Sequence, residues 1–360
     1  MLAAVCHEFG QPLVVEEVDL ESPQRGEVKV RMVATAICHS DVHLIRGEWG
    51  GDLPLVAGHE GAGIVEQIGP DVTLVHKGDH VVVSLLRSCG RCESCCTGTP
   101  HLCRAEFALQ RESRLRGRDG RPIYQGLNTA AFAQSVVVDQ SQLVTVPEAV
   151  PLESACLLAC GVITGFGAVT NRAKVAPGSS VVVIGVGGVG LNALQGARHV
   201  GAYPIIAVDL LDSKLETSLA FGATHTVNAA RDDLRAAVAQ ITGGRLADYA
   251  FVTVGSAAAA EQAYSLTGPR GTLVFVGIPD WVTKAAIPIG ATIIHEKTVT
   301  GSFMGTTRLT VDVPRLVAMY QGKRLMLDEL ITARYPLSRI NEAIAATEAG
   351  TALRNVIVFD

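Results

Sequence analysis

A cluster of cysteines in the first third of the chain has the spacing of a metal site. Cys89, Cys92, Cys95 and Cys103 lie within a segment of 15 residues. Cys-x-x-Cys spacing lets two sulfurs share one tetrahedral ion, and four thiolates close its coordination sphere. The pattern therefore predicts a structural zinc site. Cys96 could replace Cys95, although the even spacing favours Cys95, and four reduced surface thiols without a metal would invite oxidation.

A second pattern, G-x-G-x-x-G, follows directly on the apolar run Val181–Ile184. A glycine-rich turn between a strand and a helix holds a pyrophosphate, because its backbone approaches the anion and the N-terminal amides of the helix point at it. The turn consists of Gly185, Val186, Gly187, Gly188, Val189 and Gly190. The pattern alone is weak, and its place after a buried strand is what predicts a dinucleotide site.

Asp209 defines the expected cofactor. It ends the next apolar run, 19 residues after Gly190, where a carboxylate can hold the ribose hydroxyls of an adenosine. The same carboxylate would repel a 2′-phosphate, and Leu210 and Leu211 offer no cation to receive one. These residues favour NAD over NADP. Lys214 could reach the same ribose or be a solvated helix charge.

Three dispersed residues could form a metal site of a different kind. Cys38 and His59 lie in the N-terminal part, and Cys160 lies where the sequence changes character. Two sulfurs and one imidazole would leave a fourth position for water or substrate, as a catalytic zinc requires. Each residue alone is ambiguous, since Cys160 and its neighbour Cys156 stand in an apolar stretch typical of a core. Their spacing alone does not join the three.

The elements that must position these residues fall into three segments. Up to residue 161, short β-type runs such as Glu27–Val33, Gly63–Ile68 and His80–Ser84 are broken by Gly and Pro, which predicts an all-β fold. In the segment 162–303, apolar β-branched runs alternate with Ala-rich helical stretches, as in a parallel sheet buried on both faces. The last segment, 304–360, is too short to stand alone. We expect this segment to complete the first domain, so that the doubly wound α/β domain is inserted between two parts of it in the sequence.

The expected elements of the α/β domain can be stated as ranges. The strands are Val181–Ile184, Ile205–Val208, Tyr249–Val254 and Leu273–Val276. The helices are Gly188–Val200, Ser213–Phe221, Leu234–Thr242 and Ala257–Leu266. For the last segment we expect two amphipathic helices and a final strand, Asn355–Phe359.

The composition argues against several other classes of protein. The net charge is −5 and the basic residues are scattered, so the chain has no basic patch for nucleic acid. No apolar run reaches membrane-spanning length, and the N-terminus lacks the pattern of a signal peptide. The nine cysteines are an odd number, which argues against a disulfide framework. We expect a cytoplasmic protein without a membrane or nucleic-acid partner.

Together these motifs resemble those of the zinc-containing medium-chain alcohol dehydrogenases, along the whole chain. The resemblance is carried by Gly58-His59-Glu60-x-Ala62-Gly63, the four-cysteine segment, the turn from Gly185 to Gly190, and Cys160-Gly161-x-x-Thr164-Gly165. It implies a GroES-like catalytic domain, a Rossmann domain, NAD, and one catalytic and one structural zinc ion per chain. The chain is more similar than average to bacterial NAD-dependent alcohol dehydrogenases and thiol-dependent formaldehyde dehydrogenases.

The resemblance assigns roles to the dispersed residues. Cys38, His59 and Cys160 match the catalytic zinc ligands, so that the metal acts as a Lewis acid on an alcohol oxygen. Glu60 matches an acid that approaches the metal transiently. Asp41 matches the carboxylate that orients the imidazole of His59.

Further residues match contacts to the proton and to the cofactor. Ser40 and His43 match a proton relay, although His43 could also be an ordinary surface histidine. The matching cofactor contacts are Thr164, Val276, Ser302, Met304 and Arg354. His39 stands where many relatives carry Arg, so we expect cofactor affinity to strengthen as the pH falls through the range of histidine.

The substrate pocket is implied by aligned positions, at Trp49, Leu85, Gly126 and Leu127. Leu85 and Gly126 stand where aromatic residues often narrow the site in ethanol-active relatives. Smaller groups leave volume, and apolar walls favour apolar ligands. We therefore expect a medium-sized or bulky primary or secondary alcohol, with the matching aldehyde or ketone as product.

The sequence leaves open an alternative substrate, a non-catalytic role and the oligomeric state. Six arginines between Arg104 and Arg121 are either a solvated loop or a contact for an acidic thiol adduct, which makes an S-(hydroxymethyl)thiol the main alternative substrate. A non-catalytic binding protein on the same fold is a weaker alternative, because the relay and ligand residues are all present. The stretch Ala285–Ile289 matches the family's dimer strand, so we expect a homodimer or homotetramer.

Overall fold

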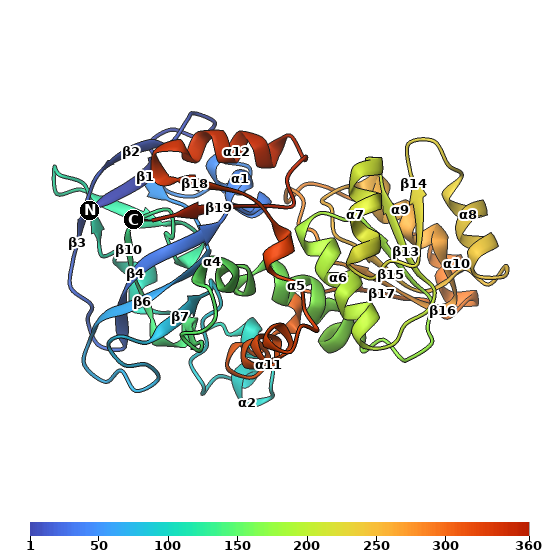
Figure 1. Ribbon diagram of the computed structural model, residues 1–360, viewed down its shortest axis with the longest axis horizontal. Coiled ribbons are helices and arrows are strands. Elements are labelled where there is room, and N and C mark those ends of the chain that lie inside the picture. Colours follow the sequence, from blue (N-terminus) through green and yellow to red (C-terminus); the bar gives the residue numbers. More distant parts are fainter. Residues whose placement is uncertain (360) are drawn as a thin grey trace. The chain divides into compact units, whose positions relative to one another are not determined.

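The protein, seen here as a computed structural model that describes residues 1–359, divides into two compact units (Figure 1). Met1–Gly161 and the chain from Arg308 onward form a β-rich unit, and Val162–Thr307 form an α/β unit. The sequence places the end of the α/β unit at residue 303, whereas the structure places it at Thr307. The reason is that Gly305 still belongs to the α/β unit, where its carbonyl accepts a hydrogen bond from Asn171 at 3.3 Å.

Two sheets make up the β-rich unit. The first has the strand order β2 (Val14–Glu17), β1 (Leu2–Cys6), β5 (Leu55–Val56), β9 (Pro122–Gln125), β8 (Leu115–Arg116), β3 (Asp19–Leu20). The second has the order β11 (Leu143–Thr145), β7 (His80–Val83), β6 (Glu60–Ile68), β4 (Glu27–Ala36), β19 (Arg354–Val358), β18 (Ile331–Pro336), and β10 (Ser135–Asp139) also pairs with β4. Nearly all of these pairs are antiparallel, as the short punctuated runs predict.

The C-terminal segment belongs to the β-rich unit because β19 pairs with β4. Val356 lies opposite Ala36 and Val358 lies opposite Ala34 in an antiparallel register. Figure 1 shows this directly, since the red β19 lies beside the blue β4. The sequence predicts β19 but not β18, which extends the sheet at its edge.

The helices of the β-rich unit are mostly short connections. The α-helices are α1 (His39–Ile45), α2 (Glu93–Cys96), α3 (Ala108–Arg111), α4 (Leu152–Ala155), α11 (Leu309–Gln321) and α12 (Ile340–Glu348). The 3₁₀ helices are η1 (Pro100–Leu102), η2 (Gly126–Asn128), η3 (Gln140–Gln142), η4 (Cys156–Ala159), η7 (Asp328–Leu330) and η8 (Leu337–Arg339). The two longest, α11 and α12, are the amphipathic helices that the sequence predicts for the last segment.

The α/β unit is a doubly wound parallel sheet. Its strand order is β14 (His225–Asn228), β13 (Ile205–Asp209), β12 (Val181–Ile184), β15 (Ala247–Val252), β16 (Thr267–Phe275), β17 (Thr298–Gly301), and every pair is parallel. In chain order this is 3-2-1-4-5-6, the Rossmann arrangement, whose ligand site lies where the order reverses between strands 1 and 4. That point lies between β12 and β15.

Helices connect these strands as the sequence predicts. They are α5 (Gly161–Gly167), the π-helical turn η5 (Ala168–Ala173), α6 (Gly188–His199), α7 (Asp212–Ala220), α8 (Leu234–Ile241), α9 (Ala257–Leu266), α10 (Ile289–Ile294) and the 3₁₀ turn η6 (Met304–Thr306). The four helices expected from the periodicity agree with α6 to α9 to within one residue at each end. Between residues 1 and 359 no single helix could cross a membrane, and only the bent pair Leu152–Ala159 and Gly161–Ala173 has the necessary length and composition.

The strand expected at Ala285–Ile289 is not formed. The residues up to Pro288 have no regular structure, and Ile289 already begins α10. Proline has no backbone N–H to donate to a ladder, so Pro288 disfavours a strand at this position. Ile293 and Ile294 of α10 are about three-quarters exposed in the single chain. The homodimer or homotetramer remains a prediction.

The arginine-rich segment is anchored by a buried ion pair. Arg114 is 1% exposed and Glu27 is 2% exposed. Their contact is bidentate, with Arg114 Nε and Nη2 each 2.9 Å from a Glu27 oxygen. The prediction of a wholly solvated loop is therefore wrong for Arg114, because the carboxylate at the start of β4 is buried and needs a counter-ion.

We predict that Arg114→Leu destabilises the protein strongly. Removing one partner of a buried ion pair leaves the other charge uncompensated, which costs about 3–5 kcal/mol. The matched control is Arg118→Leu, because Arg118 is 72% exposed and pairs with Glu17 at the surface. An exposed pair contributes about 0–1 kcal/mol. Urea unfolding followed by tryptophan fluorescence measures both, and equal midpoints would contradict the prediction.

Candidate active site

Four potential metal ligands meet in the β-rich unit. Cys38, His59, Glu60 and Cys160 place their ligand atoms within 4.8 Å of one another, and all four are buried. Three elements bring them together. Cys38 precedes α1, His59 and Glu60 stand at the start of β6, and Cys160 follows η4. The structure thus gathers the four residues that the resemblance groups and that spacing alone does not join.

The turn before His59 depends on a glycine. Gly58 has φ +92°, a conformation that side chains rarely adopt. A β-carbon there would also lie 2.6 Å from the backbone nitrogen and the ring of Phe132. Gly58 therefore lets the chain turn tightly beneath Phe132 and deliver His59 to the cluster.

Asp41 determines the orientation and tautomer of His59. Its Oδ1 lies 2.8 Å from His59 Nδ1 and accepts the backbone N–H of Gly58 at 3.0 Å, while Oδ2 accepts that of Cys38 at 3.0 Å. Because Nδ1 carries the proton that it donates to Asp41, Nε2 presents a bare lone pair. Nε2 is buried and has no hydrogen-bond partner among the described residues. This arrangement is typical of a histidine that binds a metal.

The charges of the cluster also indicate a cation. The hydrogen bond from Cys160 and the nearby His59 hold the pKa of Cys38 well below its usual value, whereas the hydrogen bond with Cys38 and burial raise that of Cys160. Burial raises the pKa of Glu60 to about 7. Two buried sulfurs at this distance cannot both ionise without a positive charge between them. Two sulfurs, an imidazole and a nearby carboxylate fit zinc.

Arg354 contacts this cluster from β19. Its Nη1 lies 3.3 Å from Glu60 Oε1. Burial alone would lower the pKa of Arg354, but Glu60 and Cys38 raise it, so the guanidinium stays charged. Its Nη2 has no hydrogen-bond partner among the described residues. The pyrophosphate contact expected of Arg354 stays a prediction, and the contact with Glu60 is an addition to it.

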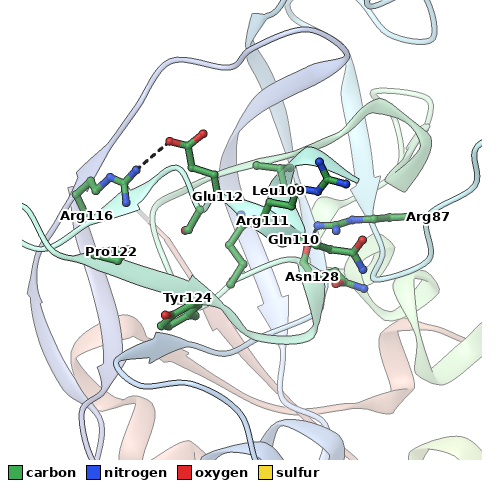
Figure 2. A pocket seen from close by; sticks show the side chains of 11 residues that line it. Arg87, Leu109, Gln110, Arg111, Glu112, Arg116, Pro122, Tyr124 and Asn128 are labelled. Atoms are coloured by element: carbon green, nitrogen blue, oxygen red, sulfur yellow. Dashed lines mark hydrogen bonds and ion pairs between the residues drawn. The ribbon is translucent and has the colours of Figure 1, made fainter. Parts of the chain in front are cut away.

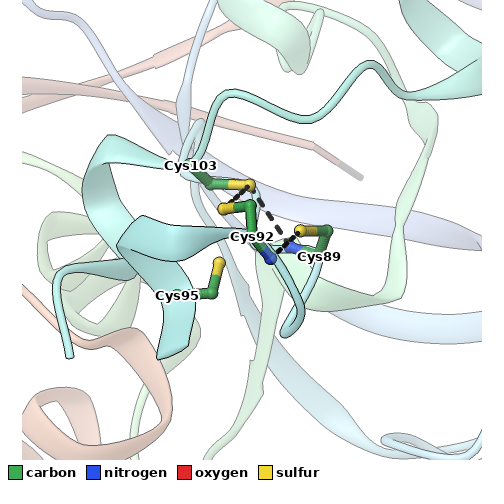
Figure 3. Close-up of side chains that lie close together, drawn as sticks. All are labelled: Cys89, Cys92, Cys95 and Cys103. Carbon is green, nitrogen blue, oxygen red and sulfur yellow. Dashed lines mark hydrogen bonds between the residues drawn. The ribbon is translucent and has the colours of Figure 1, made fainter. Parts of the chain in front are cut away.

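The second cluster contains the four cysteines of the first motif (Figure 3). Cys89, Cys92, Cys95 and Cys103 place their sulfurs within 4.8 Å of one another. The exposed Cys96 is outside this group and its sulfur faces the Gly90 carbonyl at 3.8 Å.

The pKa values of this cluster diverge strongly. The backbone N–H of Cys95 helps to lower the pKa of Cys92 to about 6, whereas burial and the neighbouring sulfurs raise that of Cys95 to about 12. Four crowded sulfurs compete for negative charge, and a bound zinc ion would remove that competition.

The relay candidates lie on α1, directly after Cys38. Ser40 and His43 are three residues apart, so they share one face of the helix. His43 Nδ1 is hydrogen-bonded to the carboxylate of Glu48, and the imidazole stacks on Trp49 with 5.2 Å between ring centroids. Sequence reasoning missed Glu48. An acidic residue five positions after His43, just beyond the glycine that ends the helix, is the signal that could have indicated it.

The expected substrate residues have unequal support. Leu85 is half-buried, and Leu127 packs on the core of the β-rich unit. The idea that Gly126 leaves volume for a substrate is wrong. A β-carbon there would lie 2.7 Å from the Val56 carbonyl oxygen and 2.8 Å from Leu44 Cδ2, so this glycine permits close packing inside the domain.

A pocket of about 390 Å³ lies beside the arginine-rich segment (Figure 2). It is lined by three arginines, Arg87, Arg111 and Arg116, and by neither Leu85 nor Leu127. Arg87 donates from Nε to Gln142 and from Nη2 to the Asn128 carbonyl.

The other two arginines of this pocket face carboxylates. Arg111 pairs with Glu106, and Arg116 pairs with Glu21 at 2.9 Å and Glu112 at 3.5 Å. The positive charges of Arg111 and Arg116 are thus already matched by carboxylates.

The glycine-rich turn lies at the switch point of the α/β unit. Gly185 has φ +87°, and a β-carbon at Gly190 would overlap the Gly185 carbonyl oxygen. Both glycines are therefore required by the fold itself. At Gly187, by contrast, a β-carbon would meet nothing within 4 Å. The protein fold alone does not require glycine there. This is expected at a position where the backbone must come close to a bound pyrophosphate.

Asp209 stands at the end of β13 beside this turn. Its carboxylate accepts backbone N–H groups of Val186 at 2.9 Å, Leu210 at 2.8 Å and Leu211 at 3.2 Å. Three amides therefore fix the negative charge at the edge of the turn. Lys214 is half-buried in the first turn of α7.

The remaining cofactor candidates lie beyond neighbouring strands of the same sheet. Val276 follows β16, and Ser302 follows β17 with its N–H donating to the Phe275 carbonyl at 2.8 Å. The hydroxyl of Thr164 lies 3.7 Å from the sulfur of Met304. Val276, Ser302 and Met304 follow the carboxyl ends of strands, where open α/β sheets bind ligands, whereas Thr164 lies on α5. His39, the first residue of α1, is exposed in the β-rich unit.

Comparison with known proteins defines the class of protein. Residues 24–148 match the family described as an alcohol dehydrogenase GroES-like domain, and residues 188–321 match the family described as a zinc-binding dehydrogenase. The NDMA-dependent alcohol dehydrogenase of Amycolatopsis methanolica is 38% identical over 365 residues, which cover 99% of this chain and 98% of that protein.

Solved structures agree with these matches. The alcohol dehydrogenase zinc-binding domain protein from Burkholderia ambifaria has a TM-score of 0.95 at 36% identity, covering 100% of this chain and 98% of that chain. The benzyl alcohol dehydrogenase from Acinetobacter calcoaceticus has a TM-score of 0.93 at 34% identity, covering 100% and 99%. The fold and both clusters thus describe a zinc-binding, GroES-like dehydrogenase. The chain belongs to the zinc-containing medium-chain alcohol dehydrogenases.

We predict that the two adjacent cysteines differ in zinc binding. Cys95→Ala removes one of four convergent sulfurs, so the purified protein should contain about one zinc ion per chain instead of about two. Cys96→Ala is the matched control, since its sulfur lies outside the cluster, and it should keep both ions. Elemental analysis of the purified proteins measures the ratio. Equal zinc content in the two variants would overturn the assignment of Cys95.

Proposed function

We propose that this alcohol dehydrogenase transfers a hydride between NAD and a medium-sized or bulky apolar alcohol. The observation that carries the proposal is the buried cluster of Cys38, His59 and Cys160, in which Asp41 orients His59 and its Nε2 has no hydrogen-bond partner within residues 1–359. Three such ligands leave one corner of a tetrahedral ion for the substrate oxygen.

The residues of the chain have separate tasks in this reaction. A zinc ion held by these ligands supplies Lewis-acid chemistry, which lowers the pKa of the alcohol hydroxyl. Asp41 keeps the imidazole of His59 rigid, so that the open corner has a fixed direction. Ser40 and His43 would accept the proton that the hydroxyl loses, and bound NAD would supply the acceptor for the hydride.

The proposal that NAD is the cofactor rests on Gly187 and Asp209. Gly187 borders open space without any constraint from the fold, and Asp209 holds a fixed carboxylate beside it. A carboxylate there can accept ribose hydroxyls and repels a 2′-phosphate. Because one relative is named for its dependence on NDMA, that compound belongs in the assays beside NAD.

We predict that Gly187→Ala weakens NADH binding at least about tenfold, roughly 1.4 kcal/mol, by placing a methyl group where the pyrophosphate backbone contact forms. The unfolding midpoint should not change, because the new β-carbon meets no protein atom within 4 Å. Gly290→Ala is a matched control, since its surroundings are equally open and it lies in α10. Fluorescence titration with NADH and NADPH measures the affinities. Unchanged NADH affinity in Gly187→Ala, or tighter NADPH binding by the wild type, would contradict the assignment.

The substrate class is proposed from the pocket positions that survive the structural analysis. Leu85 remains a half-buried apolar residue where a larger aromatic group would narrow the site, whereas Gly126 no longer supports extra volume. The similarity to a benzyl alcohol dehydrogenase supports an aromatic or longer aliphatic alcohol. An S-(hydroxymethyl)thiol is the alternative, and the matched charges of Arg111 and Arg116 weigh against it.

We predict that kcat/KM for benzyl alcohol and for hexan-1-ol is more than about ten times that for ethanol. The reason is that each additional buried CH₂ group contributes up to about 0.8 kcal/mol to binding. Leu85→Phe should lower this ratio, because the larger ring would narrow the site for the bulky alcohols. The panel includes a thiol–formaldehyde adduct and uses NAD alone or with NDMA. Ethanol as the best substrate would exclude the bulky-alcohol proposal, preference for the adduct would establish the alternative, and zinc-loaded protein inactive on every substrate would favour a binding role.

A further inference from the structure

Glu48 is bound to His43 in a way that sequence reasoning did not foresee. The chain turns at Gly47, and the backbone N–H of Glu48 donates to the His43 carbonyl at 3.0 Å. This turn brings the carboxylate back onto Nδ1 of the imidazole, where the two groups are hydrogen-bonded. The ring of Trp49 stacks on the same imidazole, with the two ring planes inclined by 22°. Two consecutive residues therefore determine where the imidazole lies.

The hydrogen bond fixes which nitrogen can take up a proton. A carboxylate only accepts, so the neutral imidazole must carry its hydrogen on Nδ1 and leave Nε2 with a free lone pair. The side chains of His43 and Glu48 are 26% and 34% exposed. The pair is thus held by the protein and still reaches solvent, which suits a group that passes a proton outward.

The neighbouring charges leave this carboxylate to His43. Arg46 Nη1 lies 3.9 Å from Glu48, whereas Arg46 Nη2 lies 2.7 Å from Glu348 of α12. The closest cation is therefore engaged mainly by a different acid. The charged groups around His43 are Glu48, then Arg46, then Glu348 behind it.

We propose that Glu48 is a positioning residue of the proton relay, and this rests on the proposed function. It holds the Nδ1–H tautomer of His43, so that Nε2 accepts the proton released from the alcohol. The resulting imidazolium is stabilised by the carboxylate until it returns a proton to water. The hydroxyl loses a proton to His43, and the carbon loses a hydride, with both electrons of the C–H bond, to the NAD of the proposed function. The two losses together account for the two-electron oxidation of the alcohol.

The test is a double-mutant cycle on kcat and its pH profile. Glu48→Gln should lower kcat roughly tenfold near neutral pH, less than the roughly 10²–10⁴-fold contribution of a general base itself, because the imidazole remains in place; KM for the alcohol should change little. The loss should shrink at alkaline pH, where hydroxide takes the proton directly. Glu48→Asp should recover most of the activity. In a His43→Gln background Glu48→Gln should change kcat less than about twofold, because both substitutions act on one group.

Controls separate a relay role from a structural one. Glu342→Gln on α12 breaks an exposed ion pair with Arg339 and leaves Arg46 paired with Glu348, so it should leave kcat unchanged. Additive losses in the double variant, or an unchanged pH profile in Glu48→Gln, would overturn the proposal. The ¹⁵N shifts of the His43 ring give a readout independent of activity. They should report Nδ1–H in the wild type and a mixture in Glu48→Gln, so that failure of the dehydrogenase assignment and failure of this proposal remain distinguishable.

Discussion

The carboxylate of Asp41 is the constraint on which the catalytic site depends. It is wholly buried, and its two oxygens hold the start of α1, the turn at Gly58 and the ring of His59. A buried carboxylate without these donors would be very costly, so all three hydrogen bonds are needed to stabilise Asp41 in its buried position. The same residue thereby fixes the backbone that carries Cys38 and the direction of the histidine lone pair. Orientation of the candidate metal ligands is a consequence of satisfying one buried charge.

The sequence predicts what is encoded locally. Cys89 to Cys103 lie within one short segment, and the turn from Gly185 to Gly190 follows directly on its strand, so spacing alone indicates both sites. The helices and strands of the parallel sheet are equally legible, because burial on both faces leaves continuous apolar runs.

What the sequence does not predict depends on tertiary contacts. Cys38, His59 and Cys160 become one site only through the packing of three elements, and the family resemblance was needed to join them. From its aligned position Gly126 suggests added pocket volume, yet a β-carbon there would run into Val56 and Leu44. Arg114 looks like a loop charge until Glu27 is seen beside it. In each case the partner lies far along the chain, and periodicity does not identify it.

Because β19 pairs with β4, the surroundings of the ligand cluster are completed only when the end of the chain has been synthesised. The edge of β4 that receives β19 leaves the ribosome hundreds of residues before its partner does, and the whole α/β unit is made in between. Until Arg354 arrives, the Glu60 carboxylate beside the ligand cluster lacks its guanidinium. The Rossmann unit, continuous in the chain, can fold as soon as it has emerged. The α/β fold is thus available to a nascent molecule in which β19 has not yet completed the sheet of the β-rich unit.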